Sequence, residues 1–111
     1  MSTASTGRRR EYFVRDHMIQ HGWRAIMRAA ASKGSADLLM GHEIHGAALV
    51  QVGSKSKALG PADRHRFTDD ADLIGALPLL AIVVPRAPLI VWRVTTEAPG
   101  KWDRYDIKEA G

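Results

Sequence analysis

The chain has 111 residues, with 16 Lys and Arg against 12 Asp and Glu, five His, no Cys and a hydrophobic content of 45%. This length fits one compact domain and excludes a multidomain enzyme. The lack of cysteine excludes disulfides, thiolate zinc sites, iron–sulfur clusters and cysteine nucleophiles, and nothing in the composition indicates secretion.

From the sequence we expect neither a signal peptide nor a membrane span. No apolar segment follows the charges of the first residues, MSTASTGRRR, and we expect residues 1–7 to form a disordered tail. The longest apolar run, residues 77–85, is interrupted by Pro78 and is shorter than the ~20 residues that span a bilayer. We therefore expect a cytoplasmic protein.

The net charge of +4 is distributed unevenly. Residues 1–57 carry a net charge of +5, whereas residues 58–111 carry a net charge of −1. An Arg-rich half suits phosphate, because the guanidinium group matches phosphate oxygens and binding releases counterions. The pattern favours a nucleic-acid partner, and the alternative is that the charge serves only solubility.

The first predicted element is a helix over residues 8–21. Val14 and Met18 are four residues apart, as expected for one helix face, and the Gly that follows His21 ends the pattern. Glu11 falls on the same stripe, so its carboxylate is expected to point inward.

A three-stranded meander is predicted next. Strand-like segments alternate with a small-residue loop at residues 30–35 and a hairpin tip at residues 41–46. The predicted strands are residues 23–29, 36–40 and 47–52.

A second helix follows the polar segment 53–60. Pro61 suits the first position of a helix, and Gly75 suits its end. The apolar stripe of this helix consists of Phe67, Ala71 and Ile74.

The last part of the chain predicts two strands and a tail. Residues 79–84, LLAIVV, form a continuous apolar run, as expected for a central strand that is paired in parallel and covered on both faces. Residues 89–94 form the last predicted strand, and residues 97–111 are expected to be a polar tail outside a domain of residues 8–96. The order α-β-β-β-α-β-β predicts an α/β fold with a central mixed sheet and a helix on each face.

Three of these elements are expected to bring oxygen donors together. Asp37 starts the second strand, Gln51 lies near the end of the third, and Glu11 faces inward from the first helix. Carboxylate, amide and carbonyl oxygens suit a hard cation such as Mg²⁺ or Mn²⁺. We therefore expect a metal site formed by Asp37, the Gln51 side chain, the Val52 carbonyl and Glu11, the last directly or through water.

The order of motifs resembles a known family. RRREYF opens the first helix, HGWRAIMRAAASKGSADLLM forms the hairpin with the acid, ALVQVGSKSKALGPADR contains the third strand, and ALPLLAIVVPRAPLIVWRV contains the last two. Over residues 8–95 the chain resembles small Holliday-junction-resolvase-like nucleases of the PD-(D/E)xK superfamily, found in archaea and actinobacterial phages. The resemblance implies a restriction-endonuclease-like fold, metal-dependent hydrolysis of phosphodiester bonds in branched DNA, and a homodimer with a twofold axis.

The third strand departs from the pattern of this family. In the family an acid or glutamine, one spacer residue and a catalytic lysine follow one another, and here the lysine position is Gly53. Residues 51, 53, 55 and 57 share one side if the strand continues, so Lys55 is the first candidate for the missing ammonium group and Lys57 the second. Lys55 would orient the attacking water or stabilise developing negative charge. If neither lysine reaches the site, the fold would bind DNA without cutting it.

The resemblance and the charge pattern also imply DNA contacts. Ser32 and Lys33 lie in the loop before Asp37, where relatives place a serine on the scissile phosphate. Further contacts to the DNA backbone are expected from Arg8, Arg9, Arg10, Arg24, Arg28 and Lys57.

Each candidate also has a structural explanation. Asp37 could be a turn residue, and Glu11 could serve the helix dipole. Gln51 lies within an apolar strand, which favours a ligand role because a buried amide needs partners. A third possibility is a small oligomeric interaction protein whose basic residues have no specific role.

The histidines match no metal motif. His42-Glu43-Ile44-His45 lacks the spacing of a metalloprotease helix. In a hairpin tip His42 and His45 are expected to point to opposite sides, so we do not expect them to hold a metal, even with His65 as a third ligand.

Other aromatic groups are assigned structural roles. His17 and His21, four residues apart on a helix, are expected to be surface residues. Trp23, Trp92 and Trp102 are expected in the core or at a dimer surface.

Overall fold

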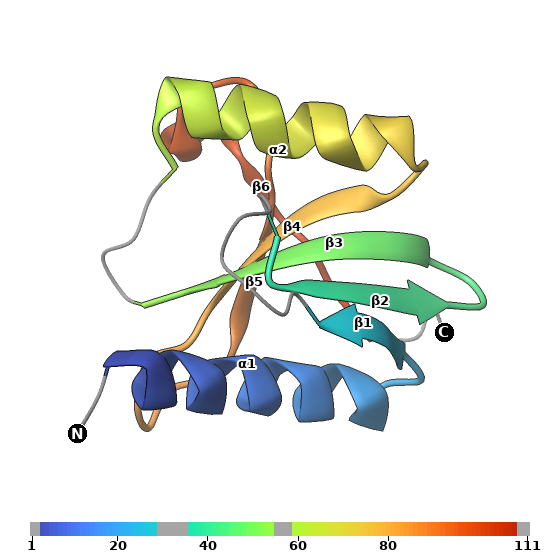
Figure 1. The fold of residues 1–111 in the computed structure, drawn as a ribbon, viewed down its shortest axis with the longest axis vertical. Coiled ribbons are helices and arrows are strands. Elements are labelled where there is room, and N and C mark those ends of the chain that lie inside the picture. The colour runs from blue at the N-terminus through green and yellow to red at the C-terminus, as the bar shows by residue number, and fades with distance from the viewer. Residues whose placement is uncertain (1–2, 29–35, 55–58, 109–111) are drawn as a thin grey trace.

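The computed structural model describes residues 3–28, 36–54 and 59–108 of the chain. Two helices enclose one sheet (Figure 1). In chain order the elements are α1 (Thr3–Gln20), β1 (Arg24–Arg28), β2 (Leu38–His42), β3 (Gly46–Gly53), α2 (Pro61–Leu73), β4 (Leu77–Ile82), β5 (Ile90–Arg93), the 3₁₀ helix η1 (Pro99–Lys101) and β6 (Asp103–Arg104).

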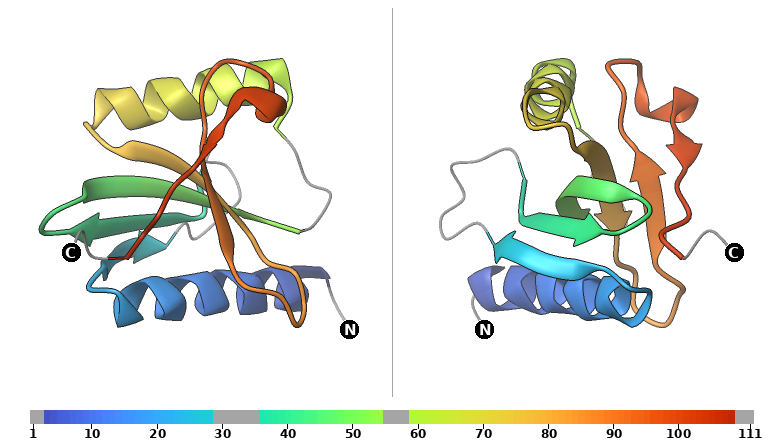
Figure 2. Two further views of the ribbon diagram at one scale, coloured as in Figure 1. Left: turned by 180° about the vertical axis from the view of Figure 1, so that it is seen from behind. Right: turned by 90° about the vertical axis from the view of Figure 1, so that its right-hand side faces the viewer.

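The six strands form one sheet in the order β1-β2-β3-β4-β5-β6. β3 and β4 are parallel, and every other neighbouring pair is antiparallel. α2 connects the parallel pair and covers one face of the sheet, and α1 covers the other face (Figures 1 and 2). The predicted α/β fold with a central mixed sheet flanked by helices is confirmed.

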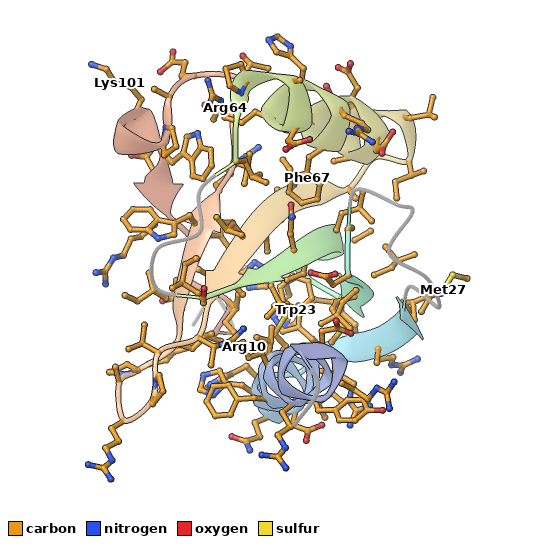
Figure 3. All side chains as sticks on the ribbon, turned by 60° about the vertical axis from the view of Figure 1, so that its left-hand side comes forward. Arg10, Trp23, Met27, Arg64, Phe67 and Lys101 are labelled. Carbon is orange, nitrogen blue, oxygen red and sulfur yellow. The ribbon has the colours of Figure 1, made fainter. Side chains whose placement is uncertain are left out.

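Alternation along the strands divides the core into two layers. Val14 and Met18 of α1 pack with Val50 of β3 in a cluster that also includes Trp23. Phe67 of α2 packs on the opposite face in a second cluster. Figure 3 shows Trp23 and Phe67 on opposite sides of the sheet.

The helix ends follow the signals in the sequence. Gly22, with φ of 91°, follows α1, and Gly75, with φ of 68°, follows α2, so both residues adopt the left-handed conformation that glycine tolerates best. Pro61 is the first residue of α2, where its missing N–H has no intrahelical partner to lose.

Both ends of the chain differ from the prediction. α1 begins at Thr3 rather than at residue 8, so it includes part of the expected disordered tail. The expected polar tail contains η1 and β6, and β6 pairs with β5. Trp102 and Ile107 are buried, with exposed fractions of 7% and 6%, because they fill the two core layers. Residues 97–108 therefore belong to the domain.

Within the described part of the chain, no helix is long and apolar enough to cross a membrane.

Candidate metal and nucleic-acid site

Asp37 lies at a bend directly before β2 and is half-buried. Its backbone N–H donates to the Val50 carbonyl at 2.9 Å. Its carboxylate oxygen Oδ2 accepts the Val52 N–H at 2.7 Å, in place of a ladder bond between strands. The side chain is therefore fixed against the end of β3 through Oδ2, and Oδ1 is its second oxygen that can bind a metal.

Gln51 lies beside Asp37, because the two hydrogen bonds of Asp37 reach the residues before and after it. Gln51 is half-buried and lies opposite Leu80 of β4, so it belongs to the face that α2 covers. Val52 directs its N–H toward Asp37, and a residue in a strand directs its N–H and C=O to the same side. The fold therefore gathers the Asp37 carboxylate, the Gln51 amide and the Val52 carbonyl at one end of the sheet.

Glu11 lies on the other side of the sheet from the Gln51 side chain. It is half-buried and shares a helical stripe with Val14 and Met18. This stripe packs on the face to which Val50 and Val52 point. The expected convergence of Glu11 with Gln51 is therefore not observed, because the two side chains lie on opposite faces of the sheet.

Gly53 is a buried part of β3 and has no side chain to supply an ammonium group. It lies opposite Ile82 of β4, and its carbonyl accepts the Val83 N–H at 3.0 Å. The candidates Lys55 and Lys57 lie outside the described residues.

The expected DNA-binding residues divide into three groups. Arg8, Arg9 and Arg24 are exposed, and Arg10 is half-buried. Arg28 ends β1, and nothing further is described of its side chain. Ser32, Lys33 and Lys57 lie outside the described residues.

The donors at Asp37 fit a hard divalent cation by type. The described residues contain no group of three or more His, Cys, Asp or Glu side chains that could hold a metal. Mg²⁺ requires fewer such side chains, because it binds through one or two carboxylates and keeps several waters. One carboxylate with amide and carbonyl oxygens therefore suits Mg²⁺ or Mn²⁺, and does not suit zinc.

A groove of about 510 Å³ lies at the other end of β2. Its lining includes Arg24, Ile26, Glu43 and Ile44. Asp37 and Gln51 are not part of this groove.

His42 holds the β2–β3 turn together. Its Nδ1 accepts the backbone N–H groups of Ile44 at 3.0 Å and His45 at 3.3 Å. Its Nε2 therefore carries the proton and donates to the His21 carbonyl at 3.1 Å. The His42 and His45 ring centroids are 4.6 Å apart, so the expectation that these rings point to opposite sides is wrong.

His45 joins the turn to the C-terminal segment. Its Nδ1 lies 2.6 Å from the Tyr105 hydroxyl, and its Nε2 lies 2.8 Å from the Lys108 carbonyl. The Trp23 indole N–H donates to the Ile107 carbonyl at 2.7 Å. With all four ring nitrogens of His42 and His45 bonded to protein groups, this cluster is structural. The sequence did contain a signal for this packing: Tyr105 and Ile107 lie in the segment that was expected to be a polar tail.

The remaining aromatic groups also support the fold. His17 and His21 contact each other edge to face with ring centroids 5.2 Å apart. Partial burial, followed by the charges of His21 and Lys108, lowers the pKa of His17 below its ordinary value of 6.5. The Trp102 indole donates to the Glu97 carbonyl at 3.0 Å.

Trp92 is half-buried, and the Arg104 guanidinium lies 5.5 Å from the centroid of its ring. Burial raises the pKa of the Tyr105 phenol above 10.0. The Arg93 charge opposes this shift, and the Asp106 charge adds to it.

Trp23 and Trp102 are buried in the core, as expected.

Of three comparisons with known proteins, the one with solved structures agrees with this architecture. No family model matches the sequence. No curated protein matches it either. Among solved structures the chain is similar to Hjc of Archaeoglobus fulgidus, a Holliday junction resolvase from an archaeal hyperthermophile. The TM-score is 0.62 at 18% sequence identity, over 77% of this chain and 74% of that chain. The chain therefore has the restriction-endonuclease-like fold of Hjc, as the resemblance implied.

Proposed function

We propose that this protein is a metal-dependent endonuclease that cuts branched DNA, with Holliday junctions as the substrate class. The observation that carries the proposal is the fixed position of Asp37 beside Gln51, at the end of the central strands. The fold supports it, because a similar structure belongs to a Holliday junction resolvase.

The chain's own oxygen donors would hold the cation. Oδ1 of Asp37, the side-chain oxygen of Gln51 and the Val52 carbonyl would bind it. When bound, Mg²⁺ or Mn²⁺ would neutralise charge on the scissile phosphate and lower the pKa of an attacking water. The Val52 N–H keeps the Asp37 carboxylate in one orientation before substrate arrives.

An ammonium group is still needed beside these donors. Gly53 supplies none, so we assign the role first to Lys55 and second to Lys57. The lysine would orient the water or stabilise negative charge as it develops on the phosphate. Ser32 and Lys33 would contact the scissile phosphate.

The basic residues of the N-terminal half would bind the DNA backbone. The exposed Arg8, Arg9 and Arg24, together with Arg10 and Arg28, would bind phosphates without reading sequence. A four-way junction requires two symmetric cuts, so the working form would be a homodimer.

A cleavage assay on a synthetic four-way junction tests the proposal. Wild type should cut the junction with Mg²⁺ or Mn²⁺ and not with EDTA, and Asp37→Asn and Lys55→Ala should each lose cutting while still binding the junction. Asp69→Asn, an exposed acid on α2, is the matched control and should cut like wild type. Full activity of Asp37→Asn would exclude the metal assignment.

Gly53 favours one alternative, a DNA-binding module of the same fold that does not cut. In that case wild type and Asp37→Asn would both bind branched DNA with the same salt dependence, and neither would cut it with either metal. Absence of salt-sensitive binding to any nucleic acid would contradict both functions and leave an interaction protein.

A further inference from the structure

The outer side of α1 carries exposed aromatic rings beside arginines. Tyr12 and Phe13 are 37% and 48% exposed, and the arginines at positions 8 and 9 are exposed as well. Positions three and four apart are neighbours on a helix surface, so Arg9 lies next to both rings and Arg8 lies next to Tyr12. We call Arg8, Arg9, Tyr12 and Phe13 the α1 platform.

The α1 platform lies on the side of the helix that the core does not use. Val14 and Met18, which are 0% and 1% exposed, hold the other side of α1 against the sheet. Arg9 is separated from Met18 by about two and a half helical turns, so the two residues lie on opposite sides of the helix. Figures 1 and 2 show α1 as an outer layer of the molecule. The exposed rings are therefore not explained by packing of the core.

Neighbouring side chains support the rings and leave the α1 platform positive. The acid one turn further along, Asp16, is paired with Arg15, with Nη2 of Arg15 at 2.9 Å from Oδ1 of Asp16. The Arg15 guanidinium also lies 4.6 Å from the centroid of the Tyr12 ring. The Phe13 ring is stacked with the His17 ring, with centroids 6.1 Å apart and planes inclined by 26°. The surface thus combines supported aromatic rings with positive charge.

This combination fits single-stranded DNA better than the other occupants of an exposed helix. Proteins bind single strands with cationic groups that contact phosphates and aromatic rings on which the bases stack. A membrane would take up the apolar side of α1, and that side is buried against the sheet. A second copy docked here about a twofold axis would bring its own Arg8 and Arg9 against those of the first, and like charges disfavour such contacts.

We propose that the α1 platform binds the unpaired bases of a DNA strand: Tyr12 and Phe13 stack on bases, while Arg8 and Arg9 bind the flanking phosphates. This assignment goes beyond the proposed nuclease function, which gives the two rings no role. Unpaired bases are present in single strands and become available where strands part at a branch. Binding here needs neither a cation nor cleavage, so it can be measured by itself.

The first experiment compares two single strands of equal charge with the full chain, by fluorescence anisotropy. One is a thymidine strand of about 16 nucleotides, within the range that single-strand-binding folds occupy, and the other is an abasic strand of the same length. Both carry the same phosphates, so only stacking on bases can separate them. We expect wild type to bind the thymidine strand on the order of 10-fold more tightly, as stacking of one or two bases provides. Equal affinity for the two strands would overturn the proposal.

Substitutions at Phe13 test whether its ring is responsible. Phe13→Leu keeps an apolar side chain without the ring, so it should weaken binding of the thymidine strand on the order of 10-fold and leave binding of the abasic strand unchanged. Phe13→Trp should retain the preference. Ile19→Ala is the matched control, because Ile19 is 46% exposed on the same helix and has no ring. Equal affinities of Phe13→Leu and Ile19→Ala for the thymidine strand would show that Phe13 does not stack on bases.

A substitution at Arg9 tests the phosphate contact. Arg9→Gln should weaken binding of both strands by the same factor and make binding less dependent on salt, because one fewer phosphate is neutralised. A loss confined to the thymidine strand would contradict this assignment.

Two further outcomes separate this proposal from its neighbours. If Phe13→Leu lowers the molar mass in sedimentation and leaves the preference for the thymidine strand intact, the α1 platform is an interface between copies and the proposal fails. If wild type prefers the thymidine strand but does not cut a four-way junction, the nuclease proposal fails and the base-binding surface stands. Cutting without this preference would have the reverse meaning.

Discussion

The Asp37 carboxylate accepts the backbone N–H of Val52 at 2.7 Å. An acid just before β2 therefore supplies the hydrogen-bond partner of an amide near the end of the neighbouring strand β3. Val52 is only 8% exposed, and its amide would lose a partner without Asp37. The structural and the ligand explanations of Asp37 are therefore compatible, since Oδ2 bonds to the backbone and the proposed metal ligand is Oδ1.

This bond predicts different effects of two substitutions at Asp37. Asp37→Ala should lower the free energy of unfolding by roughly 1–3 kcal/mol, because it removes a charged partner from a buried amide. Asp37→Asn retains an oxygen acceptor and should lose less. Urea denaturation measures both, with Asp69→Ala as the control. Equal stability of Asp37→Ala and wild type would show that the bond contributes nothing.

Restoring a lysine at position 53 tests the departure from the family pattern. Residues 51 and 53 lie on the same face of β3, so a lysine at 53 would start beside Gln51. Gly53→Lys combined with Lys55→Ala should cut a four-way junction faster than Gly53→Ala combined with Lys55→Ala. The second variant controls for the added Cβ in a buried position. Equal rates would argue against an ammonium group acting from this strand.

The C-terminal segment is predicted to be part of the folding unit. Ile107 is 6% exposed within the core under α1, so Ile107→Ala should lower the free energy of unfolding by roughly 2–4 kcal/mol. Leu73→Ala, at a side chain 85% exposed, should change it by less than about 0.5 kcal/mol. Similar denaturation midpoints for the two variants would mean that residues 97–108 do not stabilise the domain.

His17 predicts a pH dependence of stability. Its folded pKa is lowered below the ordinary value of 6.5, mainly by burial, so the unfolded chain binds a proton more readily. The ionisation of His17 therefore contributes nothing to the free energy of unfolding well above pH 6.5. It lowers that free energy as the pH falls through 6.5 toward the folded pKa. His17→Gln should lose less stability than wild type between about pH 7 and about pH 5 in thermal melts, because it removes this proton linkage. A His17→Gln curve parallel to wild type would contradict the linkage.

Local patterns predicted most of the sheet and both helices. Val14 and Met18 marked the buried stripe of α1. The apolar run of residues 79–84, which overlaps β4, identified a central strand that is paired in parallel. These signals work because burial and periodicity act within one element. The predicted neighbourhood of Asp37, Gln51 and Val52 follows from the β2–β3 pairing, which is a local hairpin.

Long-range contacts were not predictable in the same way. Ile107 is held by Trp23, 84 residues earlier, and the Tyr105 hydroxyl by His45, 60 residues earlier. Polar residues flank Ile107 in the sequence, so composition alone suggested a polar tail. Glu11 was placed on the correct helical stripe, but which face of the sheet receives that stripe depends on tertiary packing.

Paramagnetic broadening by Mn²⁺ tests the central claim most directly, because it reports where a divalent cation binds without requiring cleavage. In ¹H–¹⁵N spectra of the full chain, low concentrations of Mn²⁺ should broaden the amide signals of Asp37, Gln51 and Val52 first, and Mg²⁺ should compete. Asp37→Asn should abolish this broadening, whereas Asp69→Asn should preserve it. Broadening that is unchanged in Asp37→Asn, or that is confined to other residues, would contradict the metal site and the nuclease function that depends on it.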